Sequence, residues 1–303
     1  MIDVALAELV GCLELRNVDD DLTDEGVFEA DNLDIGYHRV FGGQILAQLI
    51  VAATRVVPDK SVKSLHVLFP REGDASRPLR YRVSTRHAGR TFAALQIVVA
   101  QEPDERVVAV ATVSMHIDED GLEHGAVPPH VGGSDNAVPQ ELDLIPWEVR
   151  VAGGVDLADR SVGPARFDWW MRSTELDGMP HDVPAGTNGT GVPQSRTGPA
   201  GSDRAGTLDQ ALLAYATDLT VIGTALRPIE GLSQADSTVR IATAVTSHTL
   251  WFHRPFAVSD WLQLSQEAPV MAGARAFGRG DVFSGDVLVA SFAQESMVRP
   301  IEA

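Results

Sequence analysis

The sequence contains the same succession of segments twice, and this internal repeat strongly limits the architectures that the chain can adopt. Each copy opens with an almost wholly apolar run of helical length that ends at a proline. The first run, GGQILAQLIVAATRVVP, ends at Pro58, and the second, DQALLAYATDLTVIGTALRP, ends at Pro228. Superposing the two prolines gives an offset of 228 − 58 = 170 residues.

Strand-like segments follow each helical run in the same order. SLHVLFP begins at Ser64 and SHTLWFHRP begins at Ser247, which gives an offset of 247 − 64 = 183 residues. Further on, HAGRTFAALQIVVA and VVAVATVSM in the first copy correspond to MAGARAFGRGDVF and VLVASFAQES in the second. Near-continuous apolar runs are typical of strands buried on both faces. Strand runs after a single helix favour the α+β class over alternating βαβ units.

A helix that is apolar on nearly every side must be enclosed by other elements. The simplest enclosure is an antiparallel sheet that curls around the helix, which is the hotdog arrangement. We therefore predict a double hotdog, with an N-terminal domain at residues 1–122 and a C-terminal domain at residues 123–303. A stretch rich in Gly, Pro and Thr at about 175–206 is expected to form a surface loop.

Charge and composition exclude several classes of function. The 303 residues carry a formal net charge of −18, so a basic footprint for nucleic acid or anionic lipid is not expected. Apolar stretches stay short of the roughly 20 residues of a membrane helix, and the N-terminus does not resemble a secretory signal. Cys12 is the only cysteine, which excludes a disulfide framework and a cysteine-based zinc site. We expect a cytoplasmic protein without a metal or cofactor.

Asp218 is an acid inside the second helical run, and the residues three and four positions away on its face are apolar. Burial is costly for a carboxylate unless it is hydrogen-bonded, and burial raises its pKa. Perturbed carboxylates are enriched at functional sites, although an acid that only caps neighbouring amides is the structural alternative. The offset of 170 places Gln48 at the corresponding position of the first copy, which favours one working site and one decayed copy.

Gln294 raises the same question on the last strand. It shares its face with apolar residues, and a buried amide needs hydrogen-bond partners. Just ahead of the LWFHRP segment, hydroxyls are supplied by Thr243, Thr246 and Ser247. Each of these three, taken alone, is most often an ordinary strand residue.

Five segments carry a resemblance to a known family: VFGGQILAQ (40–48), LHVLFPREGD (65–74), YATDL (215–219), LWFHRPF (250–256) and LVASFAQE (288–295). Together they resemble the acyl-CoA thioesterase II family, over most of the chain outside the Gly- and Pro-rich stretch. The resemblance implies a tandem double hotdog that hydrolyses acyl-CoA to free fatty acid and CoA. Dimers and tetramers are common in the family, and the oligomeric state of this chain stays open.

In that family an Asp on the second central helix, a Ser or Thr on the next strand and a Gln near the C-terminus hold the attacking water. Asp218 and Gln294 match the Asp and the Gln. The family pattern Ser/Thr-x-Asp-His-x-x-Trp-Phe-His corresponds to VTSHTLWFH here, which puts Val245 at the hydroxyl position. We take Thr246 as the replacement, which requires a β-bulge because strand alternation otherwise turns it to the opposite face. Thr243 and Ser247 remain as alternatives.

The substrate adds a demand on charge. CoA carries several phosphates, so a CoA site in so acidic a chain must gather Arg or Lys locally; His253, Arg254, Arg90 and Arg279 are candidates. Gly42 and Gly43 open the first helical run without side chains, so a substrate can approach their amides, although a tight helix entry explains them more simply.

Two other functions remain open. A hotdog enoyl-CoA hydratase needs an acid together with a His, and residues 213–223 around the acid contain no His, which disfavours it. A non-catalytic acyl-thioester-binding protein is the second alternative, in which the altered VTSH segment has ended turnover.

Overall fold

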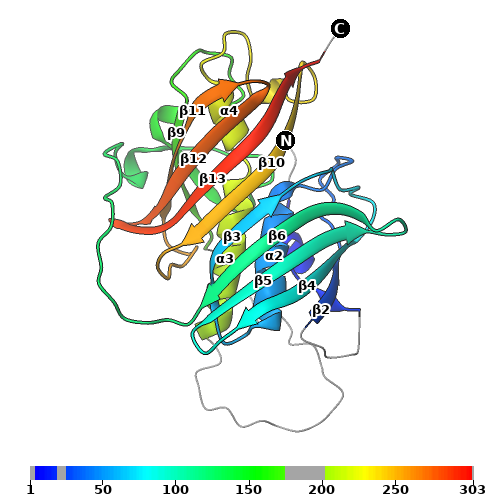
Figure 1. Cartoon of the computed structure of the whole chain (residues 1–303). Coiled ribbons are helices and arrows are strands. Elements are labelled where there is room, and N and C mark those ends of the chain that lie inside the picture. The colour runs from blue at the N-terminus through cyan, green and yellow to red at the C-terminus, as the bar shows by residue number, and fades with distance from the viewer. Residues whose placement is uncertain (1–3, 19–24, 175–201, 302–303) are drawn as a thin grey trace.

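One antiparallel sheet of thirteen strands curls around two long helices (Figure 1). The computed structural model describes residues 4–174 apart from 19–24, and residues 202–301; Glu25 and residues 202–205 are described by their backbone alone. From one edge to the other, the strands are β1 (Arg16–Asn17), β2 (Glu25–Ala30), β4 (Leu79–Ala88), β5 (Phe92–Gln101), β6 (Arg106–His116), β3 (Ser61–Leu68), β10 (Ile241–Phe252), β13 (Val287–Pro300), β12 (Arg275–Ser284), β11 (Leu262–Ala272), β9 (Arg166–Arg172), β8 (Glu148–Val151) and β7 (Val138–Pro139). Strands of the first half of the chain therefore occupy one side of the sheet, and strands of the second half occupy the other.

The first half contains α1 (Leu6–Cys12), β1 (Arg16–Asn17), β2 (Glu25–Ala30), α2 (Gly42–Val56), β3 (Ser61–Leu68), β4 (Leu79–Ala88), β5 (Phe92–Gln101) and β6 (Arg106–His116). Helix α2 is formed by the first apolar run, and its residues 43–53 are all buried. A helix buried on every side must be surrounded, and the curled sheet and the second long helix together surround it. The helix ends at Val56, two residues before Pro58, because proline cannot continue it.

The second half contains η1 (Ser134–Asn136), β7 (Val138–Pro139), β8 (Glu148–Val151), η2 (Ala152–Gly154), β9 (Arg166–Arg172), α3 (Ser202–Thr217), α4 (Val221–Leu226), η4 (Gln234–Asp236), β10 (Ile241–Phe252), β11 (Leu262–Ala272), β12 (Arg275–Ser284) and β13 (Val287–Pro300). Of the loop expected at 175–206, residues 175–201 lie outside the described residues. Its last five residues are helical, because α3 already begins at Ser202. A single glycine such as Gly206 lowers helix stability by only about 1 kcal/mol, which packing overrides.

Strands β3 and β10 join the two halves, and their register contains a local two-fold axis. The paired residues include Ser247 with Leu68, Thr249 with His66, and Trp251 with Ser64. Adding 183 to the number of a β3 residue in this set gives its symmetry counterpart on β10. When every residue is replaced by its counterpart, Ser247–Leu68 becomes Ser64–Trp251 and the set of pairs is unchanged. His66 and Thr249 lie on the axis, where Nδ1 of His66 is 2.5 Å from Oγ1 of Thr249. The repeat offset of 183 is therefore confirmed as the symmetry of the fold.

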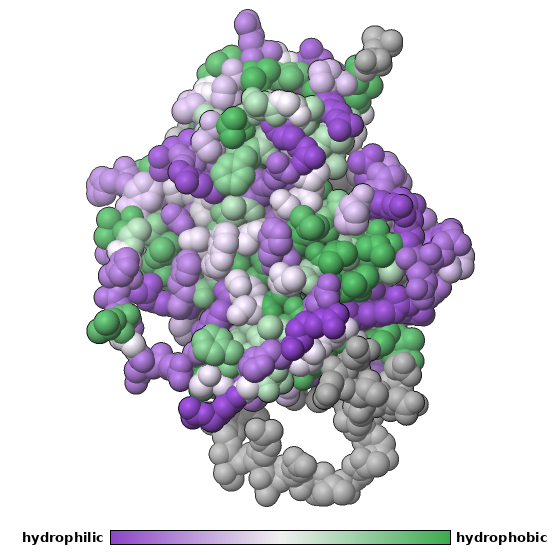
Figure 2. All heavy atoms as spheres, viewed as in Figure 1, coloured by the Kyte–Doolittle hydropathy of each residue, from purple (hydrophilic) through white to green (hydrophobic). Residues whose placement is uncertain are grey.

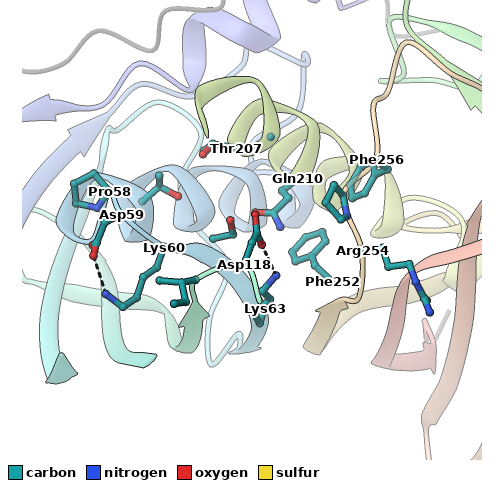
Figure 3. Close-up of a pocket in the computed structure, with 15 residues that line it drawn as sticks. Pro58, Asp59, Lys60, Lys63, Asp118, Thr207, Gln210, Phe252, Arg254 and Phe256 are labelled. Carbon is teal, nitrogen blue, oxygen red and sulfur yellow. Dashed lines mark hydrogen bonds and ion pairs between the residues drawn. The ribbon is translucent and has the colours of Figure 1, made fainter. Parts of the chain in front are cut away.

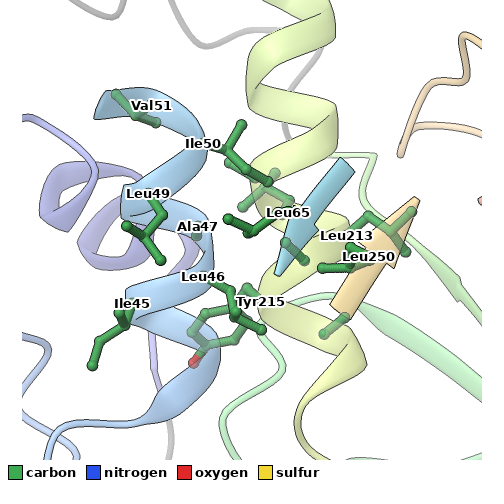
Figure 4. Packing of buried hydrophobic residues seen from close by; sticks show 14 of the residues in the cluster. Ile45, Leu46, Ala47, Leu49, Ile50, Val51, Leu65, Leu213, Tyr215 and Leu250 are labelled. Atoms are coloured by element: carbon green, nitrogen blue, oxygen red, sulfur yellow. The ribbon is translucent and has the colours of Figure 1, made fainter. Parts of the chain in front are cut away.

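The two long helices lie side by side in opposite directions. The start of α2 at Gly42 meets Asp218 just beyond the end of α3, whereas Thr54 near the end of α2 lines a cavity with Thr207 near the start of α3. Between these ends, one hydrophobic core runs through both halves (Figure 4). It includes Leu46 and Ile50 of α2, Leu213 and Tyr215 of α3, Leu65 of β3 and Leu250 of β10.

The face of the molecule in Figure 2 is a mixture of hydrophilic and hydrophobic residues. Leu68 and Trp251, near the junction of the two halves, are each exposed to a large extent, at 50% and 42%. Among the residues that the structure describes, none of the helices combines the length and the apolar character needed to span a membrane.

Candidate active site

Asp218 lies directly after α3, where the second apolar run breaks, and not inside a continuous helix as the sequence suggested. The run resumes as α4 at Val221. The Asp218 side chain points at the first turn of α2: a Cβ on Gly42 would lie 2.6 Å from Oδ2. The main-chain N–H of Gly43 donates a hydrogen bond to the carboxylate. Asp218 thus caps the N-terminus of α2, a position where negative charge is favourable.

The second oxygen of the same carboxylate is placed differently. Within the described part of the chain, Oδ1 of Asp218 is buried and has no hydrogen-bond partner. Burial raises the pKa of Asp218 to about 7, and the Gly43 N–H opposes this shift. The acid therefore has an ionisable oxygen available near neutral pH, which a general base requires.

His248, on β10, connects Asp218 to the last strand. Its Nδ1 lies 3.9 Å from Oδ1 of Asp218 and 2.9 Å from Oε1 of Gln294. Its Nε2 lies 3.1 Å from Oγ1 of Thr217. The ring is fully buried and stacks on Phe292 with an interplanar angle of 5°. Burial lowers the pKa of His248 to about 4, while the bond to Gln294 opposes that shift, so the imidazole is neutral at physiological pH.

Gln294 lies directly across the ladder from His248. Its Oε1 accepts from the imidazole, and its Nε2 donates to Oγ of Ser296 at 3.0 Å. Gln294 and Ser296 are both only 1% exposed. Because both ends of the amide are bonded, its orientation is held. The structure brings Asp218 and Gln294 together through His248.

Thr246 is placed elsewhere. The expected bulge exists: Val245 pairs with Ser296 and Ser247 pairs with Glu295, so Thr246 is the extra residue. Its hydroxyl, however, donates to the main-chain oxygen of Glu295 at 3.0 Å and lies 3.2 Å from the Glu295 carboxylate. That carboxylate forms an ion pair with Arg275 that is exposed on the surface. The bulge therefore directs Thr246 toward Glu295 and Arg275, and does not bring its hydroxyl to Asp218.

The two alternatives for the hydroxyl differ in position along β10. Ser247 pairs with Glu295, the residue whose carboxylate is on the surface, and Thr243 pairs with Val298 near the end of β13. Neither pairs with Gln294.

A different hydroxyl is buried in the site. Val245 occupies the position where the family pattern has a hydroxyl, and its partner across the ladder is Ser296. The Ser296 hydroxyl accepts the hydrogen bond from Gln294. Sequence reasoning missed Ser296 and His248. Strand alternation offered a signal, because Ser296 is two residues from Gln294 and His248 is two residues from the buried Leu250.

The two-fold axis identifies the residues that correspond to the site in the first half. His248 corresponds to Leu65, because 248 − 183 = 65. Gln294 pairs with His248, and Val113 pairs with Leu65, so Val113 corresponds to Gln294. Leu65 and Val113 are buried apolar residues. The first half therefore lacks counterparts of both polar residues, His248 and Gln294.

The same axis changes the expected counterpart of Asp218. The two helices run antiparallel, and at the end away from the Asp218–Gly42 contact Thr54 and Gly206 line one cavity; matching these two ends gives an offset of 218 − 54 = 164 and 206 − 42 = 164. The close contact itself is not repeated there, because a Cβ at Gly206 would meet no described atom within 4 Å. Because Gln48 bonds Cys12, Asp31 and Tyr81 and not α3, we match Thr54, at the end of α2, to Asp218.

Gln48 faces another part of the molecule. Its Nε2 donates to the main-chain oxygens of Cys12 and Asp31, and its Oε1 accepts from the hydroxyl of Tyr81 at 2.5 Å. The proline alignment overshot by six residues because the second run is lengthened by the break between α3 and α4.

Comparisons with known proteins agree with this architecture. A family model described as "Acyl-CoA thioesterase N-terminal domain" matches residues 30–116, and one described as "Acyl-CoA thioesterase" matches residues 196–297. Acyl-CoA thioesterase 2 of Haemophilus influenzae is 31% identical over 301 residues, which cover 97% of this chain and 98% of that protein. Acyl-coenzyme A thioesterase 8 of Homo sapiens is 26% identical, over 91% of this chain and 85% of that protein.

Two solved structures share the fold. The tesB protein of Mycobacterium avium paratuberculosis has a TM-score of 0.73 at 24% identity, over 98% of this chain and 100% of that one. Acyl-CoA thioesterase II TesB2 of Mycobacterium marinum has a TM-score of 0.72 at 24% identity, over 97% and 99%. The repeat, the enclosed helices and the full-length match to the Haemophilus relative lead to one conclusion: the chain belongs to the acyl-CoA thioesterase family and has the double-hotdog fold.

Proposed function

We propose that this chain hydrolyses acyl-CoA to a free acid and CoA, with Asp218 as the general base. One observation carries the assignment of the base. The buried carboxylate of Asp218 has one oxygen held against the start of α2, while its other oxygen has no hydrogen-bond partner among the described residues, and burial raises the pKa of the group to about 7. Such an acid is poised to accept a proton near neutral pH.

In the proposed reaction, Oδ1 of Asp218 takes a proton from water as the water oxygen adds to the thioester carbonyl carbon. The tetrahedral intermediate then collapses, the carbon–sulfur bond breaks, and the CoA thiolate receives the proton from Asp218. No covalent acyl-enzyme forms. The negative charge on the carbonyl oxygen needs preorganised donors. The start of α2 supplies them: the Gly43 N–H is bonded to Asp218, and the other N–H groups of the first turn have no partner within the helix.

We assign His248 and Gln294 as positioning residues. His248 is neutral and is bonded to Gln294, whose amide is in turn bonded to Ser296. These hydrogen bonds fix the position of the His248 ring, which faces Oδ1 of Asp218. A fixed polar group beside the acid orients the attacking water, and this lowers the entropic part of the barrier. Thr246 has no part in this arrangement, because its hydroxyl is bonded to Glu295.

A hydratase needs an acid together with a histidine. No histidine is close to Asp218 in the sequence, but the fold places Nδ1 of His248 3.9 Å from Oδ1 of Asp218. The imidazole is committed to Gln294 and Thr217, and burial lowers its pKa to about 4. An imidazole held neutral in this way is a poor acid for protonating a substrate carbon, so hydrolysis is favoured.

The test measures thiol release from a panel of acyl-CoA chain lengths, alongside hydration of crotonyl-CoA. The wild-type chain should release thiol, and Asp218→Asn should lower kcat by roughly 10²- to 10⁴-fold. Hydration without thiol release would replace the hydrolase by a hydratase. Tight binding of acyl-CoA without either reaction would make the chain a binding protein.

A further inference from the structure

A cavity, shown in Figure 3, lies between the end of α2 and the start of α3, which is the end of the helix pair away from Asp218. It has a volume of about 270 Å³. It is lined by the end of α2 with Thr54, the start of α3 with Thr207 and Gln210, the start of β3, and the residues that follow β10. Thr207 lies near the start of α3 and Asp218 directly after its end, eleven residues further on, so the cavity is roughly 16 Å from the proposed catalytic acid along the helix axis.

This cavity is the two-fold counterpart of the candidate active site. Thr54 corresponds to Asp218, and Gly206 corresponds to Gly42. The axis also pairs Phe252, which lines the cavity, with Phe69, since 252 − 183 = 69. The arrangement in which the start of one long helix lies against the end of the other is therefore repeated here. The chemistry is not, because a threonine replaces the acid, and Leu65 replaces His248.

The lining gathers cations, which is notable in a chain with a net charge of −18. Lys60, Lys63 and Arg254 all line the cavity, together with two acids, Asp59 and Asp118, which pair with the two lysines. The Lys60 side chain is only 5% exposed. Its ammonium group pairs with the carboxylate of Asp59, whose side chain is 51% exposed. Burying an ammonium group is costly unless an anion is near.

The acidic partners of the other two cations are still more exposed. Lys63 pairs with Asp118, whose side chain is 74% exposed, and Arg254 pairs with Glu123, whose side chain is 76% exposed. Exposed ion pairs contribute little net energy. An incoming anion can therefore replace these carboxylates at small cost.

Apolar groups complete the lining. Phe252 and Phe256 stack with ring centroids 6.2 Å apart, and both line the cavity with Pro58 and Ile117. Ligand pockets usually measure roughly 300 to 1,000 Å³, so this cavity takes a compact ligand segment and not a whole CoA molecule. Cations beside aromatic rings suit a segment with an anionic group next to a short apolar part.

We propose that this cavity is a second, non-hydrolytic site for the substrate class of the enzyme, which takes an anionic group with an adjoining short apolar segment. An acyl-CoA and its free acid product both present this chemistry. The proposal rests on the proposed function for the class of ligand, but its location rests on the two-fold axis and on the lining residues. Ligand bound here is not hydrolysed, because the acid of the active site is a threonine on this side.

The experiment counts ligand sites by calorimetric titration of the full chain carrying Asp218→Asn. The probe is a CoA thioether with an S-octyl chain, which has no carbonyl to hydrolyse; free CoA and octanoate are titrated separately to identify which end binds. Two equivalents per chain are expected. Adding Lys63→Glu should weaken one class of site by roughly tenfold or more, and Thr54→Phe should remove it by filling the cavity.

Arg106→Glu is the matched control, because Arg106 is an exposed cation that does not line the cavity. It should leave both sites unchanged. In the otherwise wild-type chain, Lys63→Glu should leave the rate of thiol release at limiting substrate unaltered. One equivalent per chain, or two that neither Lys63→Glu nor Thr54→Phe affects, would overturn the proposal. Two equivalents in a chain that never releases thiol would reject the proposed function and keep this second site.

Discussion

Oδ1 of Asp218 lies 3.9 Å from Nδ1 of His248, and both side chains are buried. Burial shifts their pKa values in opposite directions, to about 7 for the acid and to about 4 for the imidazole. Each shift favours the neutral form, because the interior penalises charge more than this distance rewards it. The pair is therefore an acid that ionises near neutrality beside an imidazole that does not.

The rate of hydrolysis should follow the ionisation of Asp218. A general base must be deprotonated, so kcat/KM should fall as the pH drops through about 7 and should level off above it. The measurement is thiol release between pH 5 and 9 with a substrate stable over that range. The residual rate of Asp218→Asn should not show this ionisation. A wild-type profile that rises toward acidic pH would exclude Asp218 as the base.

The free energy of unfolding should also depend on the ionisation of Asp218. Its contribution should fall as the pH rises, whereas the rate of hydrolysis should increase. Folded Asp218 keeps a proton that the unfolded chain loses at its ordinary pKa of 3.8, so between about pH 4 and 7 its contribution to stability falls as the pH rises. Asp218→Asn should thus be more stable than wild type above pH 7, by at most roughly 4 kcal/mol. The difference should shrink toward pH 4 in urea unfolding curves.

His248 contributes in the other direction to the same curves. Its folded pKa of about 4 lies below its ordinary value of 6.5, so the unfolded chain binds more protons and the His248 contribution to stability rises between about pH 4 and 6.5. Comparing wild type with Asp218→Asn at each pH cancels this contribution. An Asp218→Asn variant that is less stable at pH 8 than wild type would contradict the burial argument.

Gly42 should be indispensable for activity, whereas its two-fold counterpart should not. A Cβ at Gly42 would lie 2.6 Å from Oδ2 of Asp218, so Gly42→Ala must displace the carboxylate. A displacement of about 1 Å can cost roughly 10²-fold in rate. At Gly206 a Cβ meets no atom within 4 Å among the described residues, so Gly206→Ala is the matched control and should keep the wild-type kcat. Equal kcat values for the two variants would disprove a tight contact with Asp218.

Removing the Thr246 hydroxyl and removing the Ser296 hydroxyl should have different effects on kcat, because the first is bonded to Glu295 near the surface and the second is buried beside Gln294. Thr246→Val removes a hydroxyl bonded to Glu295 and should leave kcat near the wild-type value. Ser296→Ala removes the acceptor of the Gln294 amide and should lower kcat by roughly tenfold, because Gln294 loses its fixed orientation. Steady-state kinetics on both variants, with melting curves to confirm folding, give the comparison. The reverse order of effects would restore Thr246 as the catalytic hydroxyl.

Much of the fold could be predicted from the sequence, because the repeat survives in strand and helix patterns. The offset of 183 was correct since β3 and β10 pair directly at the junction, where an insertion would break the ladder. The helical offset of 170 exceeds the offset between the helix ends since the break after Asp218 adds length that apolar periodicity does not reveal.

The candidate site was predictable only where a polar residue stands out in an apolar segment, as Asp218 and Gln294 do. The direction in which a bulge turns its extra residue depends on the partner strand, so Thr246 could not be oriented from the sequence. His248 joined the group through cross-strand pairing with Gln294, over 46 residues of separation.

The outermost strand at each edge of the sheet has only two residues. β1 (Arg16–Asn17) and β7 (Val138–Pro139) are its outermost members, and Pro139 has no N–H to offer. Arg16 is further engaged by Asp31. Among the described residues, each outermost strand therefore offers a neighbouring molecule only two residues of backbone, which limits edge-to-edge aggregation of so large a sheet.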